Sequence, residues 1–587
     1  MSTLRSLAKG DSPVGVIRQR LVLLFFIGLA AVLLWRAIDL QTYRHRPFLL
    51  EQGEMRHLRA VKMPAHRGAI TDRHGQPLAI STPVESVWVN PQKLDPDRQL
   101  WRQLASVLDV DPTRLAHMLA TREQRQFLYL RRHVPPDVAE RVRQLKVAGV
   151  YLQREYRRYY PARDVAGHIV GFTDIDDRGL EGLELAYNDW LTGKDGAKYA
   201  IQDRLGRVVE DVEHIAKVEN GRQLRLSIDL RLQTLAHRAL EAGVKRHGAK
   251  GGSVVLLDTL TGEVLAMSNQ PAYNPNAPRE RRGARTRNRA VTDVYEPGST
   301  FKPLTVAAAM EVSELQPDSP IDTGRGLLRV GKHTVRDDPP HGLIDVRRVL
   351  ELSSNVGASQ IALGLEREAF WDGLAGIGIG VQTGVGFPGE SAGLLVGIEE
   401  WRDIHVATLA FGYGVAVTPL QLAQAYSVIA NNGRMIAPTL LARVEPPEST
   451  RVFRSDVAVQ VRAMLQSVVT DGTGKRAQVA GYRVAGKTGT ARKSERGGYA
   501  KNRYNSLFAG IAPASRPRLV LVVLVDEPQG TNYQGGRVAA PIFSEIMAGA
   551  LRLLRVAPDN ASELPHRIAL ADADEEALAD VLQAARP

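Results

Sequence analysis

The sequence has no cysteine among its 587 residues. This absence excludes thiolate nucleophiles, thiol-based metal sites and iron–sulfur clusters. It fits an oxidising compartment, where a stray thiol is a liability, although it does not prove one. Histidine offers no substitute, because no pair among the 14 histidines has the helix-face spacing of metal ligands around a carboxylate. We therefore expect no metal site.

A strong excess of one charge is also absent. The 76 basic and 64 acidic residues give a net charge of +12, which is modest for this length. No nucleic-acid recognition motif accompanies this charge, so we expect no nucleic-acid partner. With 44% hydrophobic and 24% charged residues, the composition excludes a disordered chain, a collagen-like fibre and a disulfide scaffold. The length allows about three or four domains.

Long apolar runs are rare, and the one that stands out is LVLLFFIGLAAVLLW at residues 21–35. Extended through Arg36 and Asp39 to residue 40, it reaches the length of about 20 residues that a membrane-spanning helix needs. No small-residue cleavage signal follows, because Trp35–Arg36 stands in its place. We expect a cytoplasmic tail at 1–20, a signal anchor at 21–40 and the rest of the chain outside the cytoplasm, since the basic residues precede the run. A cleaved signal peptide and a buried core helix are the alternatives.

Residues 43–220 are polar and arginine-rich, with no candidate catalytic cluster. A strand is predicted at 77–81 and helices at 100–108 and 137–145. We expect this region to be a non-catalytic docking or spacer domain.

From about residue 221 to 556 the pattern changes to a mixture of strands and helices. Asp229 is expected to cap a helix that ends near residue 242. Early and late strands with helices between them predict an α+β domain, in which distant parts of the chain form one sheet with helices packed on it. The strands are predicted at 224–228, 254–257, 264–267, 507–512 and 519–525, the last helix at 538–554, and a frayed or disordered tail at 557–587.

The first chemical motif is Tyr295–Leu304, YEPGSTFKPL. Pro-Gly makes a turn, and the apolar residues after Lys302 can continue as a buried helix. Ser299 would lie at the start of that helix, with Lys302 one turn later on the same face. A serine hydroxyl needs a base to become a nucleophile, and a desolvated lysine beside a positive helix end has a lowered pKa. Ser299 and Lys302 are therefore a candidate nucleophile and base.

Two further motifs follow in the chain. In Ser353-Ser354-Asn355, Ser353 can relay a proton to a leaving amine and the Asn355 amide can bind a substrate carbonyl. In Lys487-Thr488-Gly489-Thr490, Gly489 allows a ligand backbone to approach a strand, and the lysine with the threonine hydroxyls can hold a carboxylate. Each motif alone is weak, but the three in this order in an external protein predict one catalytic site.

This triple of motifs is typical of penicillin-binding proteins and class A β-lactamases. Over nearly its whole length the chain resembles class B penicillin-binding proteins, and most of all their cell-division branch, because elongation-type relatives usually have Asp at the position of Asn355 and often Ser at that of Thr488. A minor departure is Ala162-Arg163 after Tyr-Pro. The matching stretches are RGAITDRHGQPLA (67–79), YYPARDVAGHIVG (159–171), GLEGLE (179–184), EPGSTFKP (296–303), SSNVG (353–357), FGYGVAVTPLQLA (411–423) and KTGTA (487–491).

The resemblance implies an elongated α+β pedestal or dimerisation-like domain at 43–220 and a transpeptidase domain at 221–556, with an antiparallel sheet flanked by helices. It implies a D,D-transpeptidase that crosslinks peptidoglycan stem peptides through an acyl-enzyme on Ser299, releases terminal D-Ala and is inhibited by β-lactams. The backbone N–H groups of Ser299 and Thr490 would form the oxyanion hole. No cofactor is implied. The implied location is the bacterial inner membrane at the septum, with a lipid-II polymerase of the FtsW type and other division proteins as partners.

Four other functions compete with this interpretation. A β-lactamase would need a deacylating carboxylate, and Glu390 is at about the right distance but has Leu394 where an Asn is expected, so we interpret it as a turn residue. A bifunctional synthase would need a glycosyltransferase motif that 210–214 does not match. An elongation-type transpeptidase and a non-catalytic β-lactam sensor are the other two.

Two basic segments border the motifs. Six arginines lie within 279–289, and we expect a solvated, mobile loop there rather than contact with anionic wall polymer or lipid. A second basic loop is expected at the edge of the cleft, with Lys493, Arg496, Lys501 and Arg503.

Overall fold

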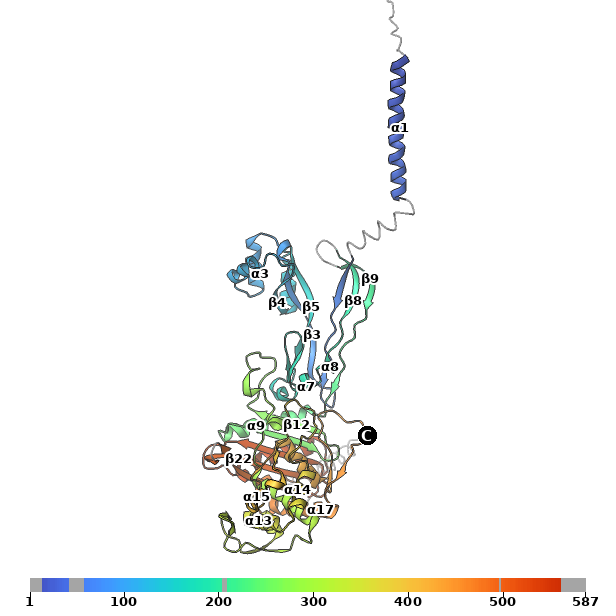
Figure 1. Ribbon diagram of the computed structural model, residues 1–587. Coiled ribbons are helices and arrows are strands. Elements are labelled where there is room, and N and C mark those ends of the chain that lie inside the picture. Colours follow the sequence, from blue (N-terminus) through green and yellow to red (C-terminus); the bar gives the residue numbers. More distant parts are fainter. Residues whose placement is uncertain (1–12, 42–57, 203–207, 496–497, 561–587) are drawn as a thin grey trace, which may run out of the picture. The chain divides into compact units, whose positions relative to one another are not determined.

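A computed structural model describes residues 13–41, 58–202, 208–495 and 498–560 (Figure 1). The chain forms two compact units. The first comprises residues up to 65, 84–155 and 194–219, and the second 66–83, 156–193 and 220 onward. Most of the expected tails at 1–20 and 557–587 lies outside the described residues.

The apolar run near the N-terminus forms α1 (Pro13–Gln41). Within it, Ile17–Asp39 is long and apolar enough to cross a membrane, with a mean hydropathy of 2.5 and none of its hydrophobic window buried. The alternative of a buried core helix is therefore wrong. Arg36 and Asp39, one turn apart near the end of α1, form an ion pair at 3.0 Å.

The first unit contains two β-structures. Strands β1 (Leu58–Met63), β8 (Gly196–Gln202) and β9 (Val208–Ala216) form an antiparallel sheet in the order β1-β8-β9. Strand β4 (Leu128–Val134) pairs with the later part of β3 (Pro77–Val89), which also pairs with β5 (Val150–Tyr159). The helices pack on Val87, Val89 and Val134; they are α3 (Arg98–Val107), α4 (Pro112–Ala120) and α5 (Pro136–Gln144), preceded by the short η1 (Pro91–Lys93). The predictions of helices at 100–108 and 137–145 are confirmed.

The second unit is built on a five-stranded antiparallel sheet in the order β12-β11-β23-β22-β21. Its strands are β11 (Gly251–Asp258), β12 (Val264–Gln270), β21 (Ala485–Glu495), β22 (Gly498–Ala512) and β23 (Leu519–Asp526). Residues of β23 alternate between two cores, with Leu521 and Val523 on one face and Val520 and Val522 on the other. Both faces of the sheet are therefore covered, as the family resemblance implied.

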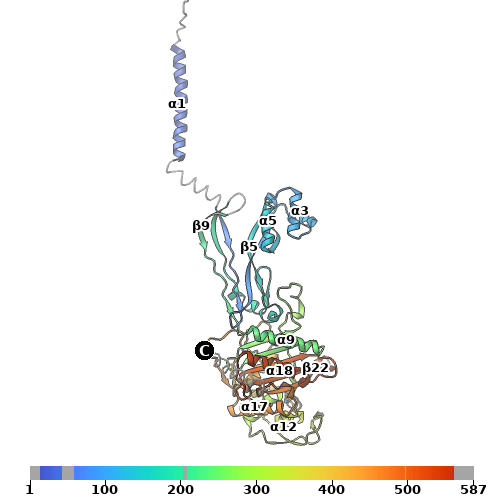
Figure 2. The same cartoon turned by 180° about the vertical axis from the view of Figure 1, so that it is seen from behind.

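Helices α9 (Leu230–Arg246) and α18 (Gly535–Leu553) cover one face, and Figure 2 shows them over β22. Helices α11 (Lys302–Val312) and α16 (Pro419–Ala430) contribute to the core on the other face. Asp229 caps α9 as expected, because its side chain accepts a hydrogen bond from Arg231 N. The strand expected at 224–228 is shorter, since only β10 (Leu224–Arg225) and a bridge from Leu226 to Leu441 form.

The remaining elements of this unit are short or surround the second core. The helices are α6 (Gly167–Val170), α7 (Gly182–Ala186), α8 (Asn188–Leu191), α10 (Arg289–Thr292), α12 (Val346–Glu351), α13 (Asn355–Leu363), α14 (Arg367–Gly376), α15 (Asp403–Leu409), α17 (Ser455–Thr470), η2 (Arg163–Val165), η3 (Gly283–Arg285), η4 (Gly298–Phe301), η5 (Ile398–Glu400) and η6 (Lys475–Ala477). The strands are β2 (Ile70–Thr71), β6 (Phe172–Thr173), β7 (Gly179–Glu181), β13 (Pro320–Asp322), β14 (Leu327–Val330), β15 (His333–Arg336), β16 (Leu343–Asp345), β17 (Leu394–Leu395), β18 (Val415–Ala416), β19 (Arg434–Met435) and β20 (Thr450–Arg451).

Segments 66–83 and 156–193 belong to the second unit, which contains the five-stranded sheet. We expected them in the pedestal domain at 43–220. A buried ion cluster joins them. The Glu184 carboxylate accepts a hydrogen bond from Nε of Arg67 at 2.6 Å and from Nε of Arg158 at 2.6 Å, and all three side chains are almost fully buried. Arg67 and Glu184 come from two of the stretches that carry the family resemblance, so these stretches stabilise the fold.

Glu184→Gln tests this cluster. The substitution leaves two buried guanidinium groups without a negative charge, so we expect the free energy of unfolding to fall by about 3–5 kcal/mol. Urea unfolding followed by circular dichroism measures the loss. The matched control is Asp189→Asn, which removes an exposed carboxylate in the same region. Equal stability of the two variants would contradict a stabilising role for Glu184.

Candidate active site

Ser299 lies on a tight turn that leads into α11. Gly298 has a positive φ of 54°, which favours glycine, and its N–H donates to Gly412 O at 3.1 Å. Thr300 Oγ1 donates to Pro297 O at 2.7 Å, which closes the turn. Gly298 and Thr300 are buried, whereas Ser299 is half-buried. The turn therefore presents the Ser299 side chain from an otherwise buried segment.

Lys302, at the start of α11, is completely buried. Its Nζ donates to Asn355 Oδ1 at 2.8 Å, to Ser353 Oγ at 3.2 Å and to the Ser353 carbonyl oxygen. Lys487 on β21 is equally buried, and its Nζ donates to the same Ser353 Oγ at 3.0 Å. The structure thus brings residues of the three predicted motifs together around the Ser353 side chain.

Burial controls the protonation of these two lysines. Burial lowers the pKa of Lys302 well below that of an exposed lysine, the charge of Lys487 lowers it further, and the charge of Asp337 opposes the shift. Burial lowers the pKa of Lys487 to about 7. Among the described residues, neither amine forms an ion pair with a carboxylate. Burial therefore favours the neutral form of these two amines more than it is favoured in an exposed lysine.

The backbone conformation of Ser353 is uncommon. Ser353 has a φ of 60°, in the left-handed region that non-glycine residues rarely adopt. Helix α13 begins just afterwards, and Ser354 Oγ caps it by accepting a hydrogen bond from Gly357 N at 2.8 Å. The turn therefore directs both the hydroxyl and the carbonyl of Ser353 towards Lys302.

Gly489 allows β21 to approach the turn that carries Ser299. A Cβ at this position would lie 2.8 Å from Thr300 Cγ2 and 3.0 Å from Pro297 O. We expected Gly489 to make room for a ligand backbone, but in this structure the space is filled by the turn that carries Ser299. Glycine is needed here because strand and turn pack together.

The hydroxyl groups of Thr488 and Thr490 have partners within the protein. Thr490 Oγ1 accepts a hydrogen bond from Gly535 N at 3.0 Å, and its own proton stays available for donation. Thr488 Oγ1 lies 2.9 Å from Thr473 Oγ1. Sequence reasoning missed Thr473, which follows α17, and Asp337, which contacts the start of α13. Both lie in loops without a motif that could have indicated them.

Glu390 has a structural role, as expected. Its Oε1 accepts hydrogen bonds from Thr383 N at 2.8 Å and from Thr383 Oγ1 at 2.5 Å, and its N–H donates to Phe387 O at 3.2 Å. These contacts close a turn, so the prediction of a turn residue is confirmed.

The two basic segments differ from the expected loops. Within 279–289, the chain forms η3 and the start of α10, and the half-buried Arg281 donates to Thr173 O at 3.1 Å with its guanidinium 5.2 Å from the centre of the Phe172 ring. This segment is therefore packed on the fold rather than solvated throughout. The second segment consists of strands: Lys493 lies on β21 and pairs with Asp526 at 2.6 Å, Lys501 and Arg503 lie on β22, and Arg496 lies outside the described residues.

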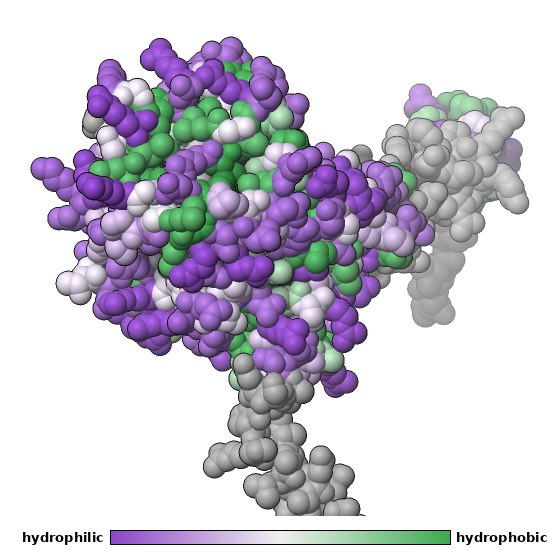
Figure 3. Space-filling model, turned by 90° about the horizontal axis from the view of Figure 1, so that it is seen from below, coloured by the Kyte–Doolittle hydropathy of each residue, from purple (hydrophilic) through white to green (hydrophobic). Residues whose placement is uncertain are grey.

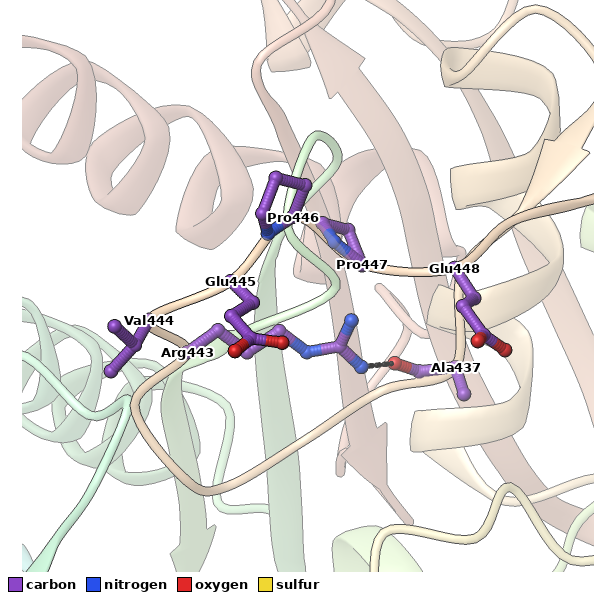
Figure 4. A pocket seen from close by; sticks show the side chains of 7 residues that line it. All are labelled: Ala437, Arg443, Val444, Glu445, Pro446, Pro447 and Glu448. Atoms are coloured by element: carbon purple, nitrogen blue, oxygen red, sulfur yellow. Dashed lines mark hydrogen bonds between the residues drawn. The ribbon is translucent and has the colours of Figure 1, made fainter.

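A cavity of about 560 Å³ lies apart from the motif residues (Figure 4). Its lining is the loop 443–448 with Ala437, and the Arg443 guanidinium donates to Ala437 O at 2.9 Å. No residue of the three motifs lines it. Figure 3, which views one face of the molecule, shows hydrophilic side chains over most of the surface with hydrophobic ones in patches between them.

Gly489→Ala tests the close packing of β21 on the turn that carries Ser299. The added methyl group meets Thr300 and the Pro297 carbonyl, so strand and turn must separate, and we expect covalent labelling by penicillin to slow by at least about tenfold. Penicillin labelling that is quenched at successive times and followed by intact-mass analysis measures the labelling rate. The control Gly364→Ala has ordinary contacts of 3.6 Å and should label normally. Normal labelling of Gly489→Ala would contradict the packing argument.

Comparison with known proteins agrees with this geometry. The family description "Penicillin binding protein transpeptidase domain" matches residues 252–548, and "Penicillin-binding Protein dimerisation domain" matches 62–226. The chain is 41% identical over 547 residues to the probable peptidoglycan D,D-transpeptidase PbpC of Pseudomonas aeruginosa, covering 93% of this chain and 96% of that protein. It is 41% identical over 524 residues to the peptidoglycan D,D-transpeptidase FtsI of Escherichia coli, covering 87% of each.

Solved structures give the same result. Penicillin-binding protein 3 of Mycobacterium tuberculosis in complex with aztreonam has a TM-score of 0.66 at 28% identity, and the match covers 85% of this chain and 99% of that one. The transpeptidase domain of penicillin-binding protein 3 from Burkholderia pseudomallei has a TM-score of 0.53 at 40% identity, and the match covers 58% of this chain and 98% of that one. From its domains, its fold and these relatives, the chain belongs to the class B penicillin-binding proteins.

Proposed function

We propose that this chain is the peptidoglycan D,D-transpeptidase of the division septum, acting through an acyl-enzyme on Ser299. The observation that carries the proposal is the contact of two buried lysine amines, Lys302 and Lys487, with one hydroxyl, that of Ser353. A neutral buried lysine beside an accessible serine is what serine acylation requires. The names of the relatives, which include peptidoglycan D,D-transpeptidases, support the same reaction.

In the first half-reaction, neutral Lys302 accepts the proton of Ser299 Oγ as this oxygen attacks the carbonyl carbon of the penultimate D-Ala. The backbone N–H groups of Ser299 and Thr490 stabilise the oxyanion that develops. The peptide C–N bond then breaks as Ser353 gives its hydroxyl proton to the departing nitrogen of the terminal D-Ala. Ser353 takes in exchange the proton held by Lys302, which it contacts, so that Lys302 becomes neutral again. The product is an ester on Ser299.

In the second half-reaction, an amine of a neighbouring stem peptide attacks the ester. A new amide bond forms, the Ser299–acyl bond breaks, and the proton lost by the amine returns through Lys302 to Ser299 Oγ. Asn355 binds an amide group of the stem peptide, while Lys487, Thr488 and Thr490 hold the terminal carboxylate of the donor. A β-lactam mimics this donor and leaves a slowly hydrolysed ester.

The proposed location is the inner membrane, with α1 as a single-pass anchor and the catalytic unit in the periplasm. The length and hydropathy of Ile17–Asp39 and the basic residues before it support this orientation. A division role is favoured over an elongation role by Asn355, Thr488 and the similarity to FtsI. We further propose an FtsW-type lipid-II polymerase and other division proteins as partners, and 43–220 as a non-catalytic docking region beside a transpeptidase domain at 221–556.

Ser299→Ala tests the nucleophile. The lost hydroxyl is small and half-buried, so the fold should persist while covalent labelling by penicillin disappears. Intact-mass analysis of the full chain in detergent, wild type beside variant, measures the adduct. A penicillin adduct on the Ser299→Ala variant would show that another residue is the nucleophile. Rapid loss of penicillin without an adduct on the wild type would indicate a β-lactamase.

Lys302→Ala tests the base. Without the amine, Ser299 Oγ has no acceptor for its proton, and we expect the acylation rate to fall by about 10²–10⁴-fold. The same mass assay, sampled over time, gives the rate constant. A rate close to that of the wild type would remove Lys302 from this role.

A further inference from the structure

The carboxylate of Asp337 contacts the start of α13, at the end of the Ser353 turn. Asp337 follows β15, and its N–H donates to Gly326 O at 2.9 Å, which fixes its backbone on the β14–β15 hairpin. Its Oδ1 accepts hydrogen bonds from Asn355 N at 2.5 Å and Val356 N at 3.1 Å. Its Oδ2 accepts one from Ser354 Oγ at 2.5 Å. One carboxylate thus accepts hydrogen bonds from three donors, two in the second motif and one from Val356, which follows it.

These contacts constrain Ser353 as well. The first N–H groups of a helix lack partners within the helix, and here Asp337 satisfies those of Asn355 and Val356 while Ser354 satisfies that of Gly357. With the helix start and Ser354 fixed, the preceding Ser353 is held in its left-handed conformation. Its hydroxyl and carbonyl groups are the ones that Lys302 contacts.

Asp337 also supplies negative charge near the buried amines. It is the carboxylate whose charge raises the pKa of Lys302, against burial and the charge of Lys487, which lower it. Other charged side chains on the helices around α11 are engaged elsewhere or exposed. Three ion pairs engage charged side chains there: Glu351 with Arg348, Arg367 with Asp403, and Asp456 with Arg454. Arg462 donates a hydrogen bond to the Ile429 carbonyl oxygen. The side chains of Arg347, Glu368 and Asp372 are exposed.

We propose that Asp337 is a positioning residue for the transpeptidase reaction: through its three hydrogen bonds it holds the Ser353 turn in the conformation that brings the Ser353 hydroxyl and carbonyl groups to Lys302. Its negative charge acts on the same base. The inference rests on the proposed function, because it assumes that acylation of Ser299 needs neutral Lys302. It adds a residue outside the three motifs, on a separate hairpin, to the machinery that controls the base.

Asp337→Asn separates charge from shape. The amide oxygen can still accept from Asn355 N and Val356 N, and the amide nitrogen can donate to Ser354 Oγ, so the turn keeps most of its contacts. Loss of the negative charge makes the protonated form of Lys302 less favourable and lowers its pKa. The acid-side midpoint of the rate of penicillin acylation should therefore move to lower pH, by on the order of one unit.

The measurement is the rate of penicillin acylation of the full chain in detergent, determined from about pH 5 to about pH 9 so that the fall in rate on the acid side is covered. Asp338→Asn is the matched control, because it removes the same charge from the adjacent, exposed position. Its midpoint should stay at the wild-type value. Asp337→Ala, which also removes the three hydrogen bonds, should shift the midpoint in the same direction and lower the plateau rate at least about tenfold.

An unchanged midpoint in Asp337→Asn, or an equal shift in Asp338→Asn, would overturn the proposal. A plateau in Asp337→Ala equal to that of the wild type would overturn its positioning part. The wild-type reaction distinguishes this failure from failure of the proposed function: if the wild type forms no adduct on Ser299, the function itself is wrong, whereas a labelled wild type with unshifted variants refutes only the role of Asp337.

Discussion

Two lysine amines are buried around one serine side chain, and the arrangement of the catalytic unit depends on this constraint. A buried ammonium group is unfavourable unless it has partners, and within the described part of the chain Lys302 and Lys487 donate to neutral oxygens of Ser353, Asn355 and Thr488. Burial lowers the pKa of both amines and so favours their neutral form, which is the form that can accept a proton from a serine. In the proposed reaction, this burial is what makes a lysine amine able to act as the base.

The sheet and its helices keep these amines in place. Strand β21 carries Lys487, and Gly489 allows it to pack directly on the turn that carries Ser299. The alternation of side chains on β23 fills a core on each face of the sheet, so β21 is attached to a sheet that cannot shift easily. The second motif reaches the site from the start of α13, which is fixed by Asp337 on a separate hairpin.

The sequence allowed prediction of the parts that depend on local patterns. Apolar periodicity and turn residues predicted the strands at 254–257 and 264–267, the helix capped by Asp229 and the late strands. The three motifs were identified from their spacing and from the family resemblance. The roles of Asp337 and Thr473 could not be predicted, because each depends on a loop that approaches a motif only in three dimensions. The packing of 66–83 and 156–193 with the catalytic unit was missed for the same reason: the buried ion cluster joins residues more than a hundred positions apart.

The most direct test of this account is the pH dependence of penicillin acylation by the wild-type chain. Because acylation needs a neutral amine, the rate should fall as the pH drops through the lowered pKa of the buried lysines, with Lys487 at about 7. A rate that rises to a plateau above about neutral pH is the predicted result. A rate that stays constant down to about pH 5, with an intact fold, would contradict the central role of the buried lysine pair.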